Sequence, residues 1–360
     1  MAVKKQKVCV IFGGRSSEHE VSRVSASYVI NNLDKEKYKI IMLGITKKGK
    51  WYLYSGKVEN LADGSWEKDK KHLTSAIISP CVSDKGLLVM QADGKVKKIK
   101  LDIIFPVLHG VYGEDGTLQG LLELSSIPYV GCGVLASSVG MNKIYSKHVF
   151  EKAGLKQAKW IAVYTKDFAD MDKIVEKISS ELGYPCFVKP ANAGSSVGIS
   201  KVNDKSELED ALCLAAKHDR QIVVEEAIVG HEVECAVLGN SFSSVRASGV
   251  GEVVSGIGFY DYDEKYKTDT AKLLIPANID EETTQKVRES AIKAFSAIDG
   301  AGLSRVDFFV TDDKEVIINE INTLPGFTSI SMYPKLWEKA GLSYSELLDE
   351  LIELGNVREK

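Results

Sequence analysis

The chain has 360 residues, more than one hydrophobic core usually serves, so we expect two or three lobes that share a cleft. Its 46 basic and 50 acidic residues give a net charge of −4, which argues against nucleic acid or an anionic membrane as a partner. The N-terminal apolar run is too short for a signal segment, no stretch approaches the ~20 apolar residues of a membrane span, and the six cysteines form no CxxC pair. We therefore expect a cytoplasmic protein with reduced thiols.

Residues 1–135 have the pattern of an open α/β lobe. Ser17 and Glu20 have the spacing of a capping box, which predicts a helix through about Asn31. Ligands of such folds gather at the carboxyl ends of the strands. Polar residues and turn signals predict hairpins or an elaborated loop over 46–100. The other elements expected in this lobe are three strands and a helix: Val8–Phe12, Ile40–Ile45, Leu101–Val107 and the helix Thr117–Leu124.

Two further lobes are expected, over residues 136–220 and 221–360. The central one alternates helix and strand, with expected elements at 143–153, 160–164, 172–182, 186–189, 199–202 and 205–217. The C-terminal one is rich in strands, with expected elements at 222–226, 232–238, 244–254, 305–310 and 315–321, and with helices at 281–298 and 344–354. The predicted fold class is therefore α/β, with α+β lobes.

The strongest local signal for chemistry is a pair of short polar motifs on two predicted strands. Arg305 and Asp307 alternate on one strand, and Glu320 and Asn322 alternate on the next. If Asp307 pairs with Glu320, all four side chains share one face of the sheet, because strand side chains alternate. Carboxylate and amide oxygens on otherwise apolar strands suit Mg²⁺ held with nucleotide phosphates. An exposed hairpin with a polar face is the alternative.

Other segments add weaker signals. Lys189 ends a strand and precedes a hairpin of small residues, 192–198, whose amides and hydroxyls could close over phosphate oxygens; a plain surface hairpin is the alternative. The pair Glu225-Glu226 could accept hydrogen bonds from an adenine amino group or ribose hydroxyls. His109 follows a strand and faces the expected cleft, and the aromatic, charged segment 259–266 is typical of a loop that folds over a ligand.

Taken together, these motifs resemble the D-alanine:D-alanine ligase family of the ATP-grasp superfamily, nearly from end to end. The matching segments, in chain order, are Gly13–Ser22, His109–Gly120, Val130–Gly133, Met141–Lys143, Val188–Pro190, Gly194–Gly198, Tyr260–Tyr266, Arg305–Asp307 and Glu320–Gly326. The resemblance implies an ATP-grasp fold with a pre-ATP-grasp N-terminal domain. It also implies ATP-dependent joining of two D-alanines through an acyl phosphate, for peptidoglycan precursors, and a homodimer.

The resemblance also assigns roles to residues. Asp307, Glu320 and Asn322 would bind two Mg²⁺ ions, which Mn²⁺ could replace. ATP would be held by Lys143, Lys189, Ser195, Ser196, Glu225, Glu226, Ile228, Glu232, Phe259, Lys265, Phe309 and Asn319. The D-alanines would contact Glu18, Val21, His109, Arg305, Gly326, Ser331 and Met332. Catalysis would rest on Glu18, Ser195, Tyr266, Arg305 and Gly326, with Arg305 and the Gly326 N–H stabilising the oxyanion and Glu18, Ser195 and Tyr266 closing the site against water.

Three alternatives stay open from the sequence. The region from Trp51 to Trp66 also resembles ligases that make D-alanyl-D-serine, although Tyr266 and the apolar Met332 favour the ordinary dipeptide. The second alternative is a nucleotide-binding relative without turnover, although its sequence keeps Arg305. The third is another ATP-grasp enzyme, and the segment Tyr260–Tyr266 argues against it.

Overall fold

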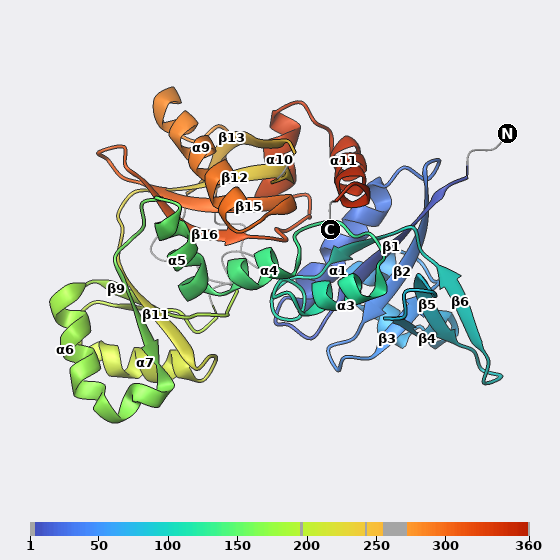
Figure 1. Ribbon diagram of the computed structural model, residues 1–360, viewed down its shortest axis with the longest axis horizontal. Coiled ribbons are helices and arrows are strands. Elements are labelled where there is room, and N and C mark those ends of the chain that lie inside the picture. The colour runs from blue at the N-terminus through green and yellow to red at the C-terminus, as the bar shows by residue number, and fades with distance from the viewer. Residues whose placement is uncertain (1–3, 195–196, 242, 255–271, 359–360) are drawn as a thin grey trace.

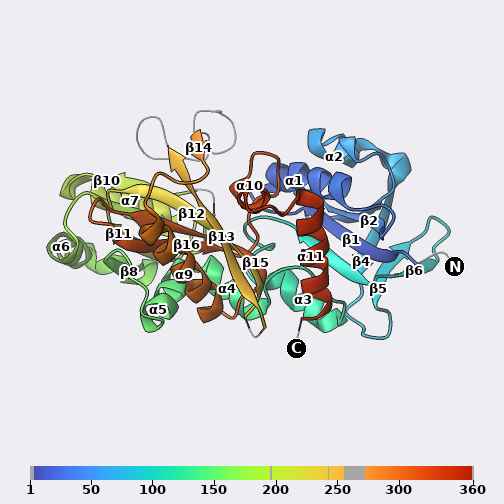
Figure 2. The ribbon, with the colours of Figure 1, turned by 90° about the horizontal axis from the view of Figure 1, so that it is seen from above.

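The computed structural model describes residues 4–194, 197–241, 243–254 and 272–358. Three sheets organise the chain, as Figures 1 and 2 show from two directions. None of the described helices is long and apolar enough to cross a membrane.

The N-terminal lobe contains a seven-stranded sheet in the order β6-β5-β4-β3-β2-β1-β7. Its elements are β1 Gln6–Gly13, α1 His19–Asn32, β2 Tyr38–Ile45, β3 Trp51–Tyr54, α2 Glu59–Asp63, β4 Leu73–Ile78, β5 Gly86–Met90, β6 Val96–Lys100, β7 Ile103–Val107 and α3 Thr117–Ser125. Strand β1 is parallel to β2 and β7, and the other pairs are antiparallel. The loops that follow β1 and β7 therefore open at one edge of the sheet, where ligands of such sheets gather.

Most of the elements expected in this lobe are confirmed, and the start of α1 is a correction. The helix begins at His19 with Glu18 as its N-cap residue, and no side chain caps it, so the predicted capping box of Ser17 and Glu20 does not form. The hydroxyl of Ser16 holds the preceding turn instead. It accepts a hydrogen bond from the Glu18 amide at 3.2 Å and donates one to the carbonyl of His109 at 2.7 Å.

The central part of the chain forms a four-stranded sheet in the order β10-β9-β11-β8. Its elements, with the two helices that lead into it, are α4 Val134–Met141, α5 Lys143–Lys152, β8 Trp160–Tyr164, α6 Met171–Glu181, β9 Cys186–Pro190, β10 Ser200–Val202, α7 Leu208–Ala216 and β11 Gln221–Glu226. The division into three lobes stays a prediction, but one assignment in it needs correction. A boundary at residue 220 puts β11 in the C-terminal lobe, whereas this strand pairs with β8 and β9 of the central sheet.

The C-terminal lobe contains a five-stranded antiparallel sheet in the order β14-β13-β12-β15-β16. Its elements are β12 His231–Asn240, β13 Val245–Val254, β14 Lys272–Leu274, α9 Glu281–Ala297, β15 Ala301–Val310, β16 Val316–Asn322, α10 Met332–Lys339 and α11 Tyr344–Asn356. Helix α10 was not predicted from the sequence. In Figure 1, α11 stands between this sheet and the N-terminal lobe.

The apolar cores are distributed unevenly among the three sheets. One cluster joins the N-terminal and C-terminal lobes, because side chains of β1, β7, β12, β15, α10 and α11 all contribute to it. The central sheet has a separate core, formed by residues of β8 to β11, α6 and α7. Figure 1 shows this part as a distinct body at the lower left.

Candidate functional site

A polar face lies on the neighbouring strands β15 and β16, in the predicted register. Arg305 pairs with Asn322 and Asp307 pairs with Glu320, and a bulge follows, in which Asn319 is the extra residue. Arg305 donates from Nε and Nη2 to the two oxygens of Asp307, both at 2.7 Å, and the Asn322 amide donates to Asp307 Oδ2 at 3.0 Å. Three of the four side chains that were predicted to share a face are therefore in contact, and the fourth, Glu320, is at the position paired with Asp307.

Arg305 is buried and has a second acidic partner, Glu234 on β12, whose Oε2 lies 3.1 Å from Nε. Burial lowers the pKa of Arg305, but Asp307 and Glu234 outweigh burial and hold that pKa well above its ordinary value. The guanidinium is therefore a fixed positive charge. Glu234 was missed at the sequence level, although its alternation with Glu232 on a predicted strand signals a shared face.

The first cavity collects the residues predicted to bind the nucleotide. Of these, eight that the structure describes line it: Lys143, Lys189, Glu225, Glu226, Ile228, Glu232, Phe309 and Asn319. The central sheet supplies Lys189 and Glu225, and the C-terminal sheet supplies Glu232, Phe309 and Asn319. A ligand in this cavity would therefore contact both parts of the molecule.

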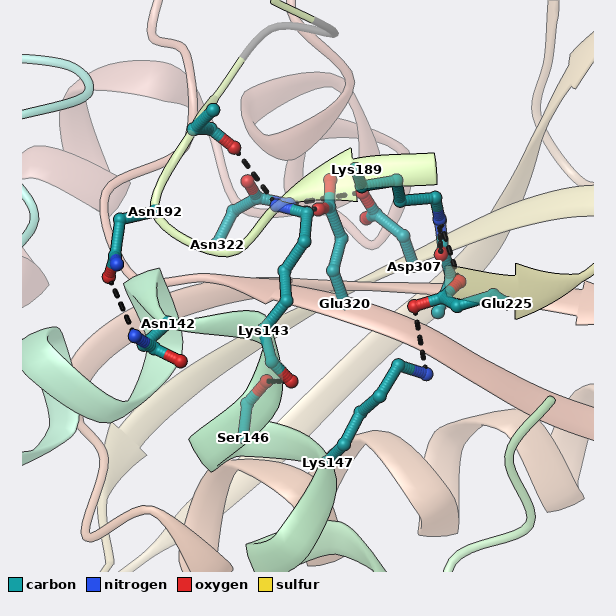
Figure 3. Close-up of polar contacts among 12 residues, drawn as sticks. Asn142, Lys143, Ser146, Lys147, Lys189, Asn192, Glu225, Asp307, Glu320 and Asn322 are labelled. Atoms are coloured by element: carbon teal, nitrogen blue, oxygen red, sulfur yellow. Dashed lines mark hydrogen bonds and ion pairs between the residues drawn. The ribbon is translucent and has the colours of Figure 1, made fainter. Parts of the chain in front are cut away.

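Lysines that line this cavity or lie behind it are paired with acidic residues, as Figure 3 shows. Lys189 Nζ lies 2.8 Å from Glu225 Oε2 and 3.5 Å from Asn319 Oδ1, and Lys147 Nζ lies 3.1 Å from Glu225 Oε1. Burial alone raises the pKa of Glu225, but the two lysines together lower it to about 2. Lys147 was missed at the sequence level, although its place four residues after Lys143 puts both on one face of α5.

The second cavity lies beside the first and is lined by Glu18, His109, Glu114, Arg305 and Gly326, among others. The loops after β1 and β7 supply Glu18 and His109, at the sheet edge where a ligand was expected. The cavity therefore joins the N-terminal lobe to the polar face on β15. Three other predicted substrate-binding residues, Val21, Ser331 and Met332, are not among its lining residues.

His109 links α1 to the loop after β16. Its Nδ1 lies 3.0 Å from the Leu324 carbonyl and its Nε2 lies 3.2 Å from the Ser25 hydroxyl. Because a carbonyl can only accept, Nδ1 carries the proton. Burial lowers the pKa of His109, with Glu18 opposing it, so the ring is neutral and its Nε2 accepts from Ser25. The imidazole thus fixes the loop that carries Gly326.

Glu114, which was not singled out at the sequence level, is a carboxyl in the second cavity, and its side chain is 14% exposed. Burial raises its pKa to about 8, and the charge of Glu18 adds to the effect. Its Oε1 accepts a hydrogen bond from the Gly110 amide at 2.8 Å and lies 3.8 Å from His109 Nδ1. Its place between Gly113 and Gly116, five residues after the strand-end His109, was the sequence signal that could have identified it as a site residue.

The two cavities meet at Lys143 and Glu320, which line both of them. Lys143 Nζ lies 3.3 Å from Glu320 Oε2 and donates to the Ala193 carbonyl at 2.9 Å. A group bound in either cavity can therefore reach the same cation and the same carboxylate. This junction is where a phosphoryl group could pass from one ligand to the other.

The donor set at the junction is suited to a hard divalent cation. Asp307 and Glu320 offer carboxylate oxygens from directly paired positions, and Asn322, whose amide nitrogen donates to Asp307, also carries an amide oxygen. Among the described residues, no group of three or more His, Cys, Asp and Glu side chains is placed to hold a metal ion. A metal at this position therefore depends on Asn322 or on oxygens of its ligand.

Some predicted residues lie outside the described part of the chain: Ser195, Ser196, Phe259, Lys265 and Tyr266. Gly194, directly before Ser195, is described and lines the second cavity. A Cβ atom added to Gly194 would lie 3.0 Å from Glu18 Oε2. The hairpin of the central lobe thus begins next to the carboxylate of Glu18 in the N-terminal lobe.

The fold of the chain, in which two cavities meet at Lys143 and Glu320, is that of the ATP-grasp class of enzymes, as matches to solved structures show. The chain matches the VanG D-Ala:D-Ser ligase of Enterococcus faecalis with a TM-score of 0.89 at 43% identity, covering 98% of this chain and 100% of that one. It matches the D-alanine-D-alanine ligase of Coxiella burnetii with a TM-score of 0.84 at 36% identity, covering 98% and 95%.

Sequence comparison narrows the class to a family. The models described as D-ala D-ala ligase N-terminus and C-terminus match residues 7–132 and 149–353. The D-alanine--D-alanine ligase of Acetivibrio thermocellus is 53% identical, over 98% of this chain and 96% of the relative, and that of Clostridium acetobutylicum is 47% identical, over 98% and 99%. The chain belongs to the D-alanine–D-alanine ligase family.

Proposed function

We propose that this enzyme joins two D-alanine molecules into D-alanyl-D-alanine, a precursor of peptidoglycan, and converts ATP to ADP and phosphate. The observation that carries the proposal is the junction of the two cavities at Lys143 and Glu320. A nucleotide on one side and an amino acid on the other would place a γ-phosphoryl group next to a carboxylate. Proximity of that kind makes an otherwise bimolecular transfer effectively intramolecular.

In the first step, Glu18 holds the ammonium group of the first D-alanine, whose carboxylate attacks the γ-phosphorus. An O–P bond forms and the bond to ADP breaks, which gives an acyl phosphate. Lys143 and Lys189 stabilise the phosphate charge, and both line the nucleotide cavity. Asp307, Glu320 and Asn322 are suited to hold Mg²⁺, two ions by the family resemblance or Mn²⁺ in their place, which would neutralise the phosphate oxygens.

In the second step, the amine of the second D-alanine attacks the acyl carbonyl and phosphate leaves. Arg305 and the Gly326 N–H stabilise the oxyanion, in support of which both residues line the substrate cavity. The carboxylate of the second D-alanine is assigned to Ser331 and Met332. Ser331 is close to the Gly326 loop, because a Cβ added to Gly326 would lie 2.8 Å from its hydroxyl.

Closure of the site is assigned to Ser195 and Tyr266, together with Glu18, so that water does not hydrolyse the acyl phosphate. The approach of Gly194 to Glu18 supports this assignment for Ser195. Phosphate contacts are assigned to Ser196 and Lys265, and an adenine contact to Phe259. A homodimer and a cytoplasmic location remain predictions.

The test is phosphate release by the purified enzyme with ATP, Mg²⁺ and D-alanine. Release that requires D-alanine is expected, and D-alanine-independent turnover or no turnover would reject the proposal. Three variants separate the roles: Glu320→Ala and Asn322→Ala should weaken metal-dependent ATP binding, whereas Ser195→Ala should lower turnover and leave ATP binding intact. Equal loss of ATP affinity in all three variants would contradict the assignment of Glu320 and Asn322 to metal binding and of Ser195 to closure of the site.

A D-alanine–D-serine ligase is the second candidate, because a D-Ala:D-Ser ligase is among the matched structures. Met332 argues for D-alanine: it is 4% exposed, and its sulfur lies close to Gly251, so it offers no polar partner for a serine hydroxyl. Mass spectrometry of the product, with D-alanine, D-serine and D-lactate in competition, decides between the candidates. A mixed dipeptide as the main product would support the second.

A further inference from the structure

A triad of largely buried charges lies at the wall of the first cavity, with two members lining it and the third behind them. Its members are Lys147 on α5, Glu225 on β11 and Lys189 on β9, with each carboxylate oxygen of Glu225 paired to a different ammonium. The side chain of Lys147 is 2% exposed and that of Glu225 is 6% exposed. Within the described residues, the ammonium nitrogen of Lys147 has no hydrogen-bond partner, so its charge is compensated by the ion pair with Glu225.

The two lysines differ in what else they can reach. Lys189 lines the cavity, is 12% exposed, and also contacts Asn319, so its ammonium can exchange Glu225 for a phosphate of a bound nucleotide. Lys147 is not among the lining residues and cannot make that exchange. Lys147 is therefore the partner that Glu225 retains whether Lys189 is paired with Glu225 or bound to a nucleotide phosphate.

A buried carboxylate without a counter-charge becomes protonated or turns away, because burial disfavours its charged form. When Lys189 moves to a phosphate, Glu225 needs another cation to stay ionised. The charged groups that face Glu225 are Lys147 from α5 and Lys189 from β9, with Lys143 one turn from Lys147. Of these, Lys143 is paired with Glu320 and lines both cavities.

We infer that Lys147 is a positioning residue for adenine recognition. It holds Glu225 ionised and oriented as the acceptor for the 6-amino group of adenine while Lys189 binds phosphate. This inference rests on the proposed nucleotide role of the first cavity. It assigns the charge of Lys147 to base selectivity rather than to phosphate binding or to the chemical step.

The test compares ATP with purine riboside triphosphate, which lacks the 6-amino group, in Lys147→Met. The variant keeps an unbranched side chain that is one atom shorter and removes its charge. Because a hydrogen bond to a charged acceptor is lost, the KM for ATP should rise about tenfold or more. The KM for purine riboside triphosphate and the kcat with either nucleotide should stay within about twofold. The matched control is Lys152→Met on the exposed side of the same helix, which should leave both KM values unchanged.

Equal weakening of both nucleotides, or no change in either, would overturn the inference. If Lys147→Met does not fold, the role of Lys147 is tested by comparing Glu225→Gln with the double variant Lys147→Met/Glu225→Gln. Glu225→Gln leaves the Lys147 ammonium without its partner, so the double variant should be more stable to heat than Glu225→Gln alone. Both should show the same reduced preference for ATP, and a further loss of preference in the double variant would contradict the assignment.

Failure of this inference is distinguishable from failure of the proposed function. If the unaltered enzyme does not release phosphate with ATP and D-alanine, the function itself is wrong. If the unaltered enzyme turns over and prefers ATP, but Lys147→Met keeps that preference, only the role of Lys147 is wrong.

Discussion

The terminal lobes and the central lobe differ in how they are attached to the rest of the molecule. The N-terminal and C-terminal lobes share one apolar core, to which α11 contributes Leu347, Leu348 and Leu351. The central lobe has a core of its own, and its links to the C-terminal sheet include polar contacts such as the Ile318 amide with the Lys156 carbonyl at 2.9 Å. Helices α4 and α5, which lead into the central sheet, pack on the C-terminal sheet through Ala136 and Phe150. Apolar burial therefore joins the terminal lobes and these two helices, whereas the four-stranded central sheet has a core of its own.

The shared unit and the central lobe also supply different residues to the site. The second cavity is built mainly on the shared unit, which supplies Glu18, His109, Arg305 and Gly326. The central lobe supplies Lys189, Glu225 and the start of the hairpin at Gly194. A substrate cavity built on the shared unit and a central sheet with its own core together favour closure by movement of that sheet. The predictions that follow test this contrast.

Arg305→Ala should have the largest effect, because it removes a buried cation from the shared unit. Asp307 and Glu234 would lose the cation that they share, which costs about 3–5 kcal/mol in the free energy of unfolding. Loss of an oxyanion donor should also lower kcat by about 10²-fold or more. Denaturant unfolding and steady-state kinetics measure the two effects. Arg246→Ala, an exposed arginine of the same sheet paired with Glu350, should stay within about 1 kcal/mol of the unaltered enzyme.

Two matched leucine truncations test whether the cores are independent. Leu351 on α11 and Leu212 on α7 are both fully buried, so replacement of each by alanine should cost about 2–5 kcal/mol locally. Hydrogen exchange should show which strands lose stability in each variant. Leu351→Ala should speed exchange in β1, β7, β12 and β15 together, whereas Leu212→Ala should speed it in β8 to β11. Faster exchange in β1 and β15 of the Leu212 variant would mean that the cores are coupled.

Two buried carboxyls, one in each region, should give opposite pH dependences of stability. Burial and Glu18 raise the pKa of Glu114 to about 8, so the folded state holds a proton that the unfolded state has lost between pH 4.5 and 8. Its effect on stability therefore becomes more unfavourable as pH rises through that window. The pKa of Glu225 is lowered to about 2, because Lys147 and Lys189 outweigh burial. Its stabilisation is present above pH 4.5 and is lost as pH falls toward 2.

Urea unfolding of Glu114→Gln and Glu225→Gln across these windows measures the contrast. Relative to the unaltered enzyme, Glu114→Gln should gain stability as pH rises from 5 to 8, by at most about 1.4 kcal/mol per pH unit. Glu225→Gln should be least stable, relative to the unaltered enzyme, above pH 4.5. A difference for Glu114→Gln that does not change with pH would show that Glu114 is ionised in the fold.

Most of the fold was predictable because its strands are short apolar runs and its polar face alternates strictly. If Asp307 pairs with Glu320, alternation places Arg305 opposite Asn322, and the structure has both pairings. Helix α10 was missed, since Pro334 reads as a helix breaker although the first turn of a helix tolerates proline. Lys147 and Glu114 were missed for a different reason: their local signals are weak, and their importance comes from burial beside charges that are distant in sequence.

The smallest effect is expected from the ion pair of Lys156 and Glu315, which bridges the central lobe and the edge of β16. Both side chains are about half exposed, at 53% and 49%, so solvent and salt screen their attraction. Lys156→Ala should therefore change the free energy of unfolding by only about 0–1 kcal/mol, and it should leave the hydrogen exchange of both cores unchanged. Thermal unfolding at low and high salt measures the effect. A loss above about 2 kcal/mol would mean that polar contacts, and not the separate cores, hold the central lobe in place.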